Sequence, residues 1–157
     1  LGEGEDADES VKLILDAVQR ARVRAVVQGW DEVIAGLDLP PTVYHAGALP
    51  HSWLFGHVCC VVHHGGFGTA AAVLRAGVPA VVIPHIIDQM FWGERMHILG
   101  VGPAAIPRAK LSVDGLAQAL VQATQDTAMR TRAAELGVQI RAETGIKNAV
   151  ELITDTI

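Results

Sequence analysis

An apolar segment that runs into a glycine-rich turn and then into a helix constrains the fold of this chain more than any other feature. Residues 57–63 are apolar between two end histidines and rich in valine, which is typical of a strand buried on both faces of a sheet. The turn His63–Thr69, with the sequence HHGGFGT, leads directly into an alanine-rich helical segment at 69–76. A buried strand joined to a helix by a tight turn is the unit of parallel α/β sheets, so we expect that fold class.

The same alternation of short apolar strands and helical segments continues along the chain. Further strands are predicted at 25–28, 42–45, 80–83 and 101–106. Helices are predicted from Ser10 onward, at 69–76, at 88–99, at 113–124 with Ser112 as N-cap, at about 126–143 and at 146–156. The order predicts a doubly wound parallel sheet in a single domain, residues 1–157, with an acidic lead-in at 1–9 and C-terminal helices at about 126–157.

The first predicted element is a helix, whereas a sheet of this kind normally begins with a central strand. We therefore expect that the first strand is missing from this sequence, which would then be a piece of a longer protein. A sheet without its central strand would expose unpaired backbone, so self-association of the chain is a further expectation.

Composition excludes several classes of protein. Half of the 157 residues are hydrophobic and 18% are charged, enough apolar material to bury a core. No apolar run approaches the ~20 residues of a membrane-spanning helix, and no signal peptide opens the sequence, so we expect a cytoplasmic protein without a transmembrane segment. Five of the 17 acidic residues lie within the first nine positions, and the other 12 balance the 12 lysines and arginines. No basic surface for nucleic acid is therefore expected.

The cysteine and histidine spacings do not suggest a disulfide or a metal site. Cys59 and Cys60 are adjacent, so we expect both to be small buried side chains in a reducing compartment. His63 and His64 are also adjacent and should point to opposite faces of a strand. His85 adds no spacing typical of a metal site, so we expect no bound metal.

The turn after the apolar strand has the chemistry needed to hold a diphosphate. The glycines of His63–Thr69 allow a ligand to approach the main chain, and the N–H groups at the start of the following helix favour an anion. His64 and Thr69 add an imidazole and a hydroxyl. The same pattern also fits a turn that merely packs tightly, and the residues alone leave both interpretations open.

Asp88 and Gln89 follow the next predicted strand, at the edge of the sheet where the strands end. Ligands of open α/β sheets bind at this edge, and a carboxylate beside an amide can accept and donate hydrogen bonds to sugar hydroxyls. Alternatively, Asp88 caps its helix. Phe91 and Trp92 are expected to pack that helix onto the sheet, although one of the two rings could border an acceptor.

Taken in order, these blocks resemble the nucleotide-sugar signature of inverting UDP-glycosyltransferases, especially sterol 3-β-glucosyltransferases and bacterial relatives that glycosylate lipids or polyketides. The resemblance extends from about Ser10 to the final helix. The matching blocks are His63–Thr69, Arg75–Pro79, Pro84 with Asp88–Gln89, and the flanking segments Leu49–Phe55 and Phe91–Arg95.

The resemblance implies the Rossmann-like C-terminal half of a GT-B enzyme, a hexosyltransferase whose co-substrate is a UDP-sugar and which needs no cofactor. UDP-glucose is the first donor to consider, with TDP and other hexoses left open. The implied contacts are His64, Gly65, Gly66, Gly68 and Thr69 around the diphosphate, Asp88 and Gln89 at the sugar, and Leu49 and His51 along the nucleoside. The acceptor would be a hydroxyl of a sterol, a lipid or another small hydrophobic molecule.

The chain departs from the family pattern at two places. Ala48 stands where plant members have a tryptophan that stacks on uracil, and Ala71–Val73 replace a ribose-binding glutamate. Trp30 or Trp53 could stack on the base instead, but we expect both in the core.

The family's general base is a histidine of the N-terminal, acceptor-binding domain, which this sequence does not include. We therefore expect the isolated chain to bind the donor without transferring the sugar. Half of a nucleotide-sugar epimerase and a non-catalytic nucleotide-sugar-binding module are the alternative functions.

Overall fold

The computed structural model describes residues 7–154, apart from the side chains of residues 146 and 147. Most of the expected acidic lead-in lies outside the described residues, and the helix predicted from Ser10 begins at Ala7. The helices are α1 (Ala7–Ala21), α2 (Asp31–Ile34), α3 (His51–Leu54), α4 (Phe67–Ala76), α5 (Ile87–Ile98), α6 (Val113–Gln125), α7 (Thr127–Ala142) and α8 (Gly145–Thr154), with 3-10 turns η1 (Phe55–His57) and η2 (Arg108–Lys110). None of these helices is long and apolar enough to cross a membrane.

The strands form two parallel pairs. Strand β1 (Ala25–Gln28) pairs with β2 (Val43–Ala46), with Ala25 opposite Val43 and Gln28 opposite Ala46. Strand β3 (Val61–His63) pairs with β4 (Ala80–Val82), with His63 opposite Val82. The α/β class and the parallel strands are confirmed, but within residues 7–154 the backbone pairing forms two two-stranded sheets rather than one continuous sheet.

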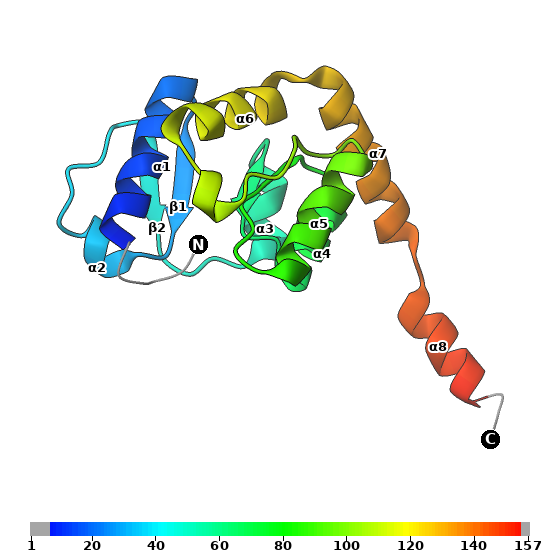
Figure 1. Ribbon diagram of the computed structural model, residues 1–157. Coiled ribbons are helices and arrows are strands. Elements are labelled where there is room, and N and C mark those ends of the chain that lie inside the picture. The colour runs from blue at the N-terminus through cyan, green and yellow to red at the C-terminus, as the bar shows by residue number, and fades with distance from the viewer. Residues whose placement is uncertain (1–6, 155–157) are drawn as a thin grey trace.

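Helices cover the strands on both faces. Successive residues of β4 show this clearly, because Val81 and Val82 are both buried yet belong to different hydrophobic clusters. Val81 lies with residues of α1 and α6 such as Val18 and Leu120, and α6 lies across α1 in Figure 1. Val82 lies with residues of α4, α5 and α7. This arrangement is the double winding expected from the sequence.

The strand predicted at 57–63 is shorter than expected. His57 belongs to the 3-10 turn Phe55–His57, in which its Nδ1 lies 2.8 Å from the Trp53 carbonyl oxygen. Val58 is extended, but the pairing with β4 begins only at Val61, so the strand is Val61–His63. The short helices α2 and α3 were not predicted from the sequence. One helical turn is too short to produce a recognisable period of apolar residues.

The strand predicted at 101–106 does not form, although this segment runs alongside β4. The Ala80 N–H donates to the Val101 carbonyl at 3.0 Å, and the Ile106 N–H donates to the Val82 carbonyl at 2.9 Å. A regular parallel ladder would place the N–H of residue 103 on the Ala80 carbonyl between these two bonds. Residue 103 is proline, which has no N–H, so the ladder is interrupted there.

Two expectations about buried side chains were wrong in part. Cys59 is exposed, whereas Cys60 packs against the α1–α6 cluster. Burial, with the neighbouring Cys59, raises the pKa of the Cys60 thiol to about 12. Trp30 is in the core as expected, but Trp53 is 54% exposed and stacks on His57 with ring centroids 4.4 Å apart.

The C-terminal half follows the sequence closely. Ser112 caps α6 by accepting a hydrogen bond from the Gly115 N–H at 3.1 Å, as predicted. Asp126 caps α7 in the same way. Helix α7 packs against α4, while α8 projects away from the body of the molecule (Figure 1). The predicted end of the last helix, at residue 156, lies outside the described residues.

Candidate functional site

The glycine-rich turn and the Asp88–Gln89 segment lie side by side because they follow paired strands. The turn follows β3 and the segment follows β4, and the Ile83 N–H extends the pairing by donating to the His63 carbonyl at 2.9 Å. The carboxyl ends of parallel strands meet at one edge of a sheet. Residues 64–69 and 85–89 therefore share that edge, as the sequence predicted.

Gly65 permits direct contact between the turn and α5. Its φ of +95° is a conformation that L side chains rarely adopt. A Cβ on Gly65 would lie 2.7 Å from the Gln89 carbonyl oxygen and 2.9 Å from Val82 Cγ1. The turn therefore needs glycine here both for its backbone conformation and for close packing, and Gln89 is fixed against the turn as a result.

The start of α4 presents N–H groups without a side-chain cap. Gly66 is the N-cap residue, and the first intrahelical bond joins the Ala70 N–H to the Gly66 carbonyl at 2.9 Å. The N–H groups of Phe67, Gly68 and Thr69 precede that bond, so they have no partner within the helix. A serine or aspartate at the N-cap would satisfy one of them, but glycine cannot. This end of the helix suits an anion.

His64 lies over the turn, close to the same helix end. A Cβ on Gly66 would come within 2.4 Å of His64 Nε2, so the imidazole covers the space that the glycine leaves. Partial burial lowers the pKa of His64, and the Asp88 carboxylate opposes that shift. The Asp88 carboxylate therefore favours the protonated form of the His64 ring, while burial favours the neutral form.

His63 supports the turn from the end of β3. From the sequence it was placed at the start of the turn and was weighed individually only as a metal ligand. It is buried at the end of β3, and its Nδ1 accepts a hydrogen bond from the Gly65 N–H at 3.0 Å. Burial, followed by the nearby His64, lowers the pKa of His63 to about 4. The neutral ring therefore carries its proton on Nε2, which has no hydrogen-bond partner among the described residues 7–154.

Neither Asp88 nor Gln89 caps helix α5. Helix α5 has Ile86 as its N-cap residue, so Asp88 lies inside the first turn and does not cap the helix. Asp88 is exposed, with its carboxylate at the sheet edge. Gln89 Oε1 accepts a hydrogen bond from the His85 N–H at 2.8 Å, which orients its amide nitrogen as the remaining donor.

Arg108 adds a positive charge that the sequence analysis missed. Its backbone N–H donates to the Pro84 carbonyl at 3.0 Å, so η2 is held against the end of β4. Its guanidinium donates to Ser10 Oγ. Partial burial lowers the pKa of His85, and the Arg108 charge and His64 act in the same direction. Only the tertiary contact brings Arg108 to this edge, because it follows His85 by 23 positions in the sequence.

Leu49 and His51, the candidate nucleoside contacts, are related to the turn by packing and by electrostatics. Leu49 packs against the hydrophobic cluster that contains β3 and α4. His51 opens α3, stacks on Phe55 with ring centroids 4.6 Å apart, and contributes to lowering the pKa of His63. No cluster of metal-ligating side chains is present among residues 7–154.

An apolar rim is formed by Ile87, Met90 and Phe91, which lie within one turn of Asp88 on α5, and by Phe67 at the start of α4. All four are exposed, Ile87 to 87% and Phe67 to 65%. The Trp92 ring contacts two of these four side chains, with its centroid 5.2 Å from that of Phe67 and 5.3 Å from that of Phe91. Trp92 packs α5 onto the core as expected, whereas Phe91 does not.

Comparison with known proteins matches a family model described as erythromycin biosynthesis protein CIII-like, C-terminal domain, over residues 6–153. A sterol 3-beta-glucosyltransferase of Neosartorya fischeri is 39% identical over 156 residues, and one of Candida albicans is 38% identical. Each match covers 94% of this chain. The chain spans only 11% of the first protein and 10% of the second.

Solved structures agree with this similarity. The glycosyltransferase of kitacinnamycin superposes with a TM-score of 0.81 at 28% identity, covering all of this chain and 41% of that one. The spinosyn rhamnosyltransferase SpnG, solved in complex with thymidine diphosphate, gives 0.71 at 26% identity, covering 88% of this chain and 40% of that one. Both proteins are much longer than this chain, which covers 41% of the first and 40% of the second.

Proposed function

Since this chain belongs to the erythromycin biosynthesis protein CIII-like C-terminal domain family, that is, to the donor-binding domains of GT-B glycosyltransferases, we propose that it binds a UDP-sugar for an inverting sugar transfer. UDP-glucose is the donor we would test first, and TDP is the alternative nucleotide. The observation that carries the proposal is the uncapped start of α4 beside His64 and Asp88.

The diphosphate would lie at the Gly65–Thr69 turn. The N–H groups of Phe67, Gly68 and Thr69 and the positive end of the helix dipole can stabilise its charge. His64 would add a hydrogen bond from its ring and Thr69 one from its hydroxyl. The positive charge of Arg108 at the same edge of the sheet favours an anion there as well.

The sugar would lie against Asp88 and Gln89. The exposed Asp88 carboxylate can accept hydrogen bonds from two hydroxyls, while the Gln89 amide nitrogen can donate one. The nucleoside would extend toward the backbone at Leu49 and toward His51. Trp53 is exposed and stacked on His57 close to His51, so it could still offer a face to the base.

In the proposed reaction, a hydroxyl oxygen of the acceptor attacks the anomeric carbon of the sugar from the side opposite UDP. A carbon–oxygen bond forms on that side, the bond to the diphosphate breaks, and the configuration inverts. The diphosphate gains negative charge as it leaves, and the N–H groups at the start of α4 would stabilise that charge. A general base must remove the hydroxyl proton, and we assign that role to a separate N-terminal domain.

A hydrophobic acceptor fits the apolar rim. Ile87, Met90 and Phe91 are exposed within one helical turn of Asp88 on α5, and the exposed Phe67 contacts Trp92 of the same helix. The reacting carbon of the sugar would be exposed to an acceptor near this rim. Exposed apolar groups of this kind often mark a binding surface. Relatives of this chain are named sterol 3-beta-glucosyltransferases, and a sterol, a lipid or a similar small molecule is the acceptor class we propose.

The proposal can be tested by isothermal titration calorimetry of UDP and UDP-glucose with the chain and with His64→Ala and Thr69→Val variants. Each variant removes one proposed diphosphate contact, so we expect affinity to fall by about three- to thirtyfold in each. Thr131→Val, an exposed threonine on α7, is the matched control and should bind as the unaltered chain does.

Two results would contradict the proposal. A folded chain that binds neither nucleotide would show that no donor site exists in it. Equal affinity in all variants would show that the nucleotide binds elsewhere. Sugar transfer to a sterol by the isolated chain would contradict only the assignment of the base to another domain.

A further inference from the structure

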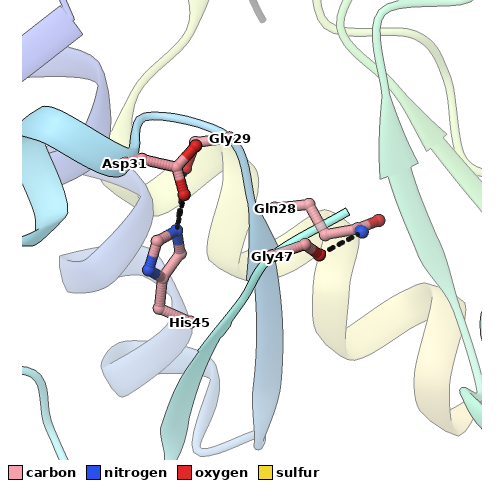
Figure 2. A network of polar contacts seen from close by, with 5 residues as sticks. All are labelled: Gln28, Gly29, Asp31, His45 and Gly47. Atoms are coloured by element: carbon pink, nitrogen blue, oxygen red, sulfur yellow. Dashed lines mark hydrogen bonds and ion pairs between the residues drawn. The ribbon is translucent and has the colours of Figure 1, made fainter. Parts of the chain in front are cut away.

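Two reciprocal hydrogen bonds cross-link the ends of β1 and β2. Gln28, the last residue of β1, donates its side-chain amide to the Gly47 carbonyl after β2 at 2.9 Å. His45 of β2 lies with Nε2 3.2 Å from the Gly29 carbonyl oxygen after β1. The same nitrogen is 3.2 Å from Asp31 Oδ1. Figure 2 shows both links, each running from one strand to the segment that follows the other.

The Gln28 link holds the segment that leads to the proposed nucleoside contacts. Gly47 is followed by Ala48, Leu49 and Pro50, and then α3 begins at His51. Within the described part of the chain, this segment has no helix or strand of its own between Ala46 and His51. A cross-link to its first residue therefore restricts the backbone just before Leu49.

The His45 link holds a different segment. It fixes the turn Gly29–Asp31, in which Gly29 and Trp30 both have positive φ angles, of 85° and 56°. A non-glycine residue in that conformation is strained and needs support from its surroundings. The two links therefore secure two neighbouring loops, of which only residues 47–50 lead into the nucleoside contacts.

We propose that Gln28 is a positioning residue for nucleoside recognition, and that it acts by holding the Gly47 carbonyl and with it the backbone at Leu49. This inference rests on the proposed function for its ligand. It adds a residue outside the turn and outside the Asp88–Gln89 segment. Gln28 would not touch the nucleotide itself, so its loss should affect recognition of the nucleoside and not of the diphosphate.

The test compares UDP with inorganic pyrophosphate, by calorimetry, for Gln28→Leu and Gln28→Glu. Leucine removes the donor, and glutamate keeps the shape but presents an acceptor to the Gly47 carbonyl. We expect either change to weaken UDP by about three- to tenfold while pyrophosphate affinity stays within about twofold. His45→Leu, which frees the other loop, and Gln139→Leu on α7 should leave the ratio of the two affinities unchanged.

Backbone ¹⁵N NMR relaxation without nucleotide supplies a readout that does not depend on the proposed function. The order parameters of Ala48 and Leu49 should fall in both Gln28 variants and not in His45→Leu or Gln139→Leu, because the Gln28 amide restrains the Gly47 carbonyl just before them. Unaltered order parameters at these two residues would overturn the inference even if UDP binds as proposed.

Equal loss of UDP and pyrophosphate in the Gln28 variants would overturn the inference as well, as would an equal change in the UDP-to-pyrophosphate ratio in His45→Leu. Failure of the unaltered chain to bind UDP would instead overturn the proposed function. A Gln28→Leu chain that does not fold leaves Gln28→Glu to decide the question by the same criteria.

Discussion

The backbone N–H of Gly65 donates to Nδ1 of His63 across 3.0 Å, so the last residue of β3 shapes the turn that follows it. The bond requires an unprotonated Nδ1, and burial keeps the His63 ring neutral by lowering its pKa to about 4. The geometry of the proposed diphosphate site is therefore coupled to the protonation of a side chain beneath it.

The free energy of unfolding should rise with pH between about 4 and 6.5 because of His63. In the unfolded chain the histidine titrates near 6.5, so over this interval the unfolded state binds more protons than the folded state. The stabilising contribution is fully present above pH 6.5 and is lost as the pH falls to about 4. A shift of this size corresponds to about 3 kcal/mol, which urea unfolding at a series of pH values can measure.

A His63→Asn variant isolates this effect, because His51, His64 and His85 remain in both proteins. The difference in stability between the variant and the unaltered chain should shrink as the pH falls from 6.5 to 4. A difference that is independent of pH would show that His63 is not held neutral. His97→Asn changes an exposed histidine of α5 and is the control.

Gly65→Ala should destabilise the fold by about 3 kcal/mol. The substitution combines a φ of +95° with a Cβ less than 3 Å from the Gln89 carbonyl and from Val82. Gly68→Ala is the matched control, because no atom of the described part of the chain lies within 4 Å of a Cβ at that position. Thermal unfolding should show a lower midpoint for the first variant and little change for the second. Equal midpoints would mean that the turn does not pack against α5 as described.

Asp88→Asn should lower the pKa of His64 further. Burial already lowers that pKa, and the Asp88 carboxylate works in the opposite direction by favouring the imidazolium. Without the Asp88 carboxylate, less opposes the lowering of the His64 pKa by burial, so the His64 ring should titrate at a lower pH. NMR titration of the His64 ring protons measures the shift, with Asp38→Asn as the control. A pKa that stays the same or rises would place Asp88 too far from His64 to act on it.

The chain should self-associate in a concentration-dependent manner. Within residues 7–154, each strand pairs with a single partner strand, and only β4 has its other edge hydrogen-bonded, to the segment 101–106, so β1, β2 and β3 each keep an edge without a neighbouring strand. Val26 of β1 is 42% exposed and adds apolar surface beside such an edge. Sedimentation velocity should show larger species at higher concentration, and Val26→Lys should reduce them more than Val138→Lys on α7 does. A monomer at all concentrations would contradict this prediction.

The sequence predicted the elements whose signals are local. The helices from α4 to α7 follow apolar periodicity and capping residues such as Ser112, and these are properties of neighbouring residues. The turn His63–Thr69 was recognised for the same reason, since its glycines and the following helix are contiguous. Where a single residue interrupts a regular pattern, as Pro103 does beside β4, the sequence alone predicted a strand that does not form.

The tertiary structure decided which residues distant in the sequence lie together in the site. It also decided the protonation state of His63. The parallel pairing of β3 with β4 brings Gly65 against Gln89, and contacts at the ends of β1 and β2 join Gln28 to Gly47. Burial fixes the neutral form of His63. The sequence by itself determined the candidate residues of the turn and of α5, because spacing along the chain encodes them. Their mutual distances, the positive charge of Arg108 and the loss of proton affinity at His63 arise only when the folded chain brings separate segments together and excludes water from them.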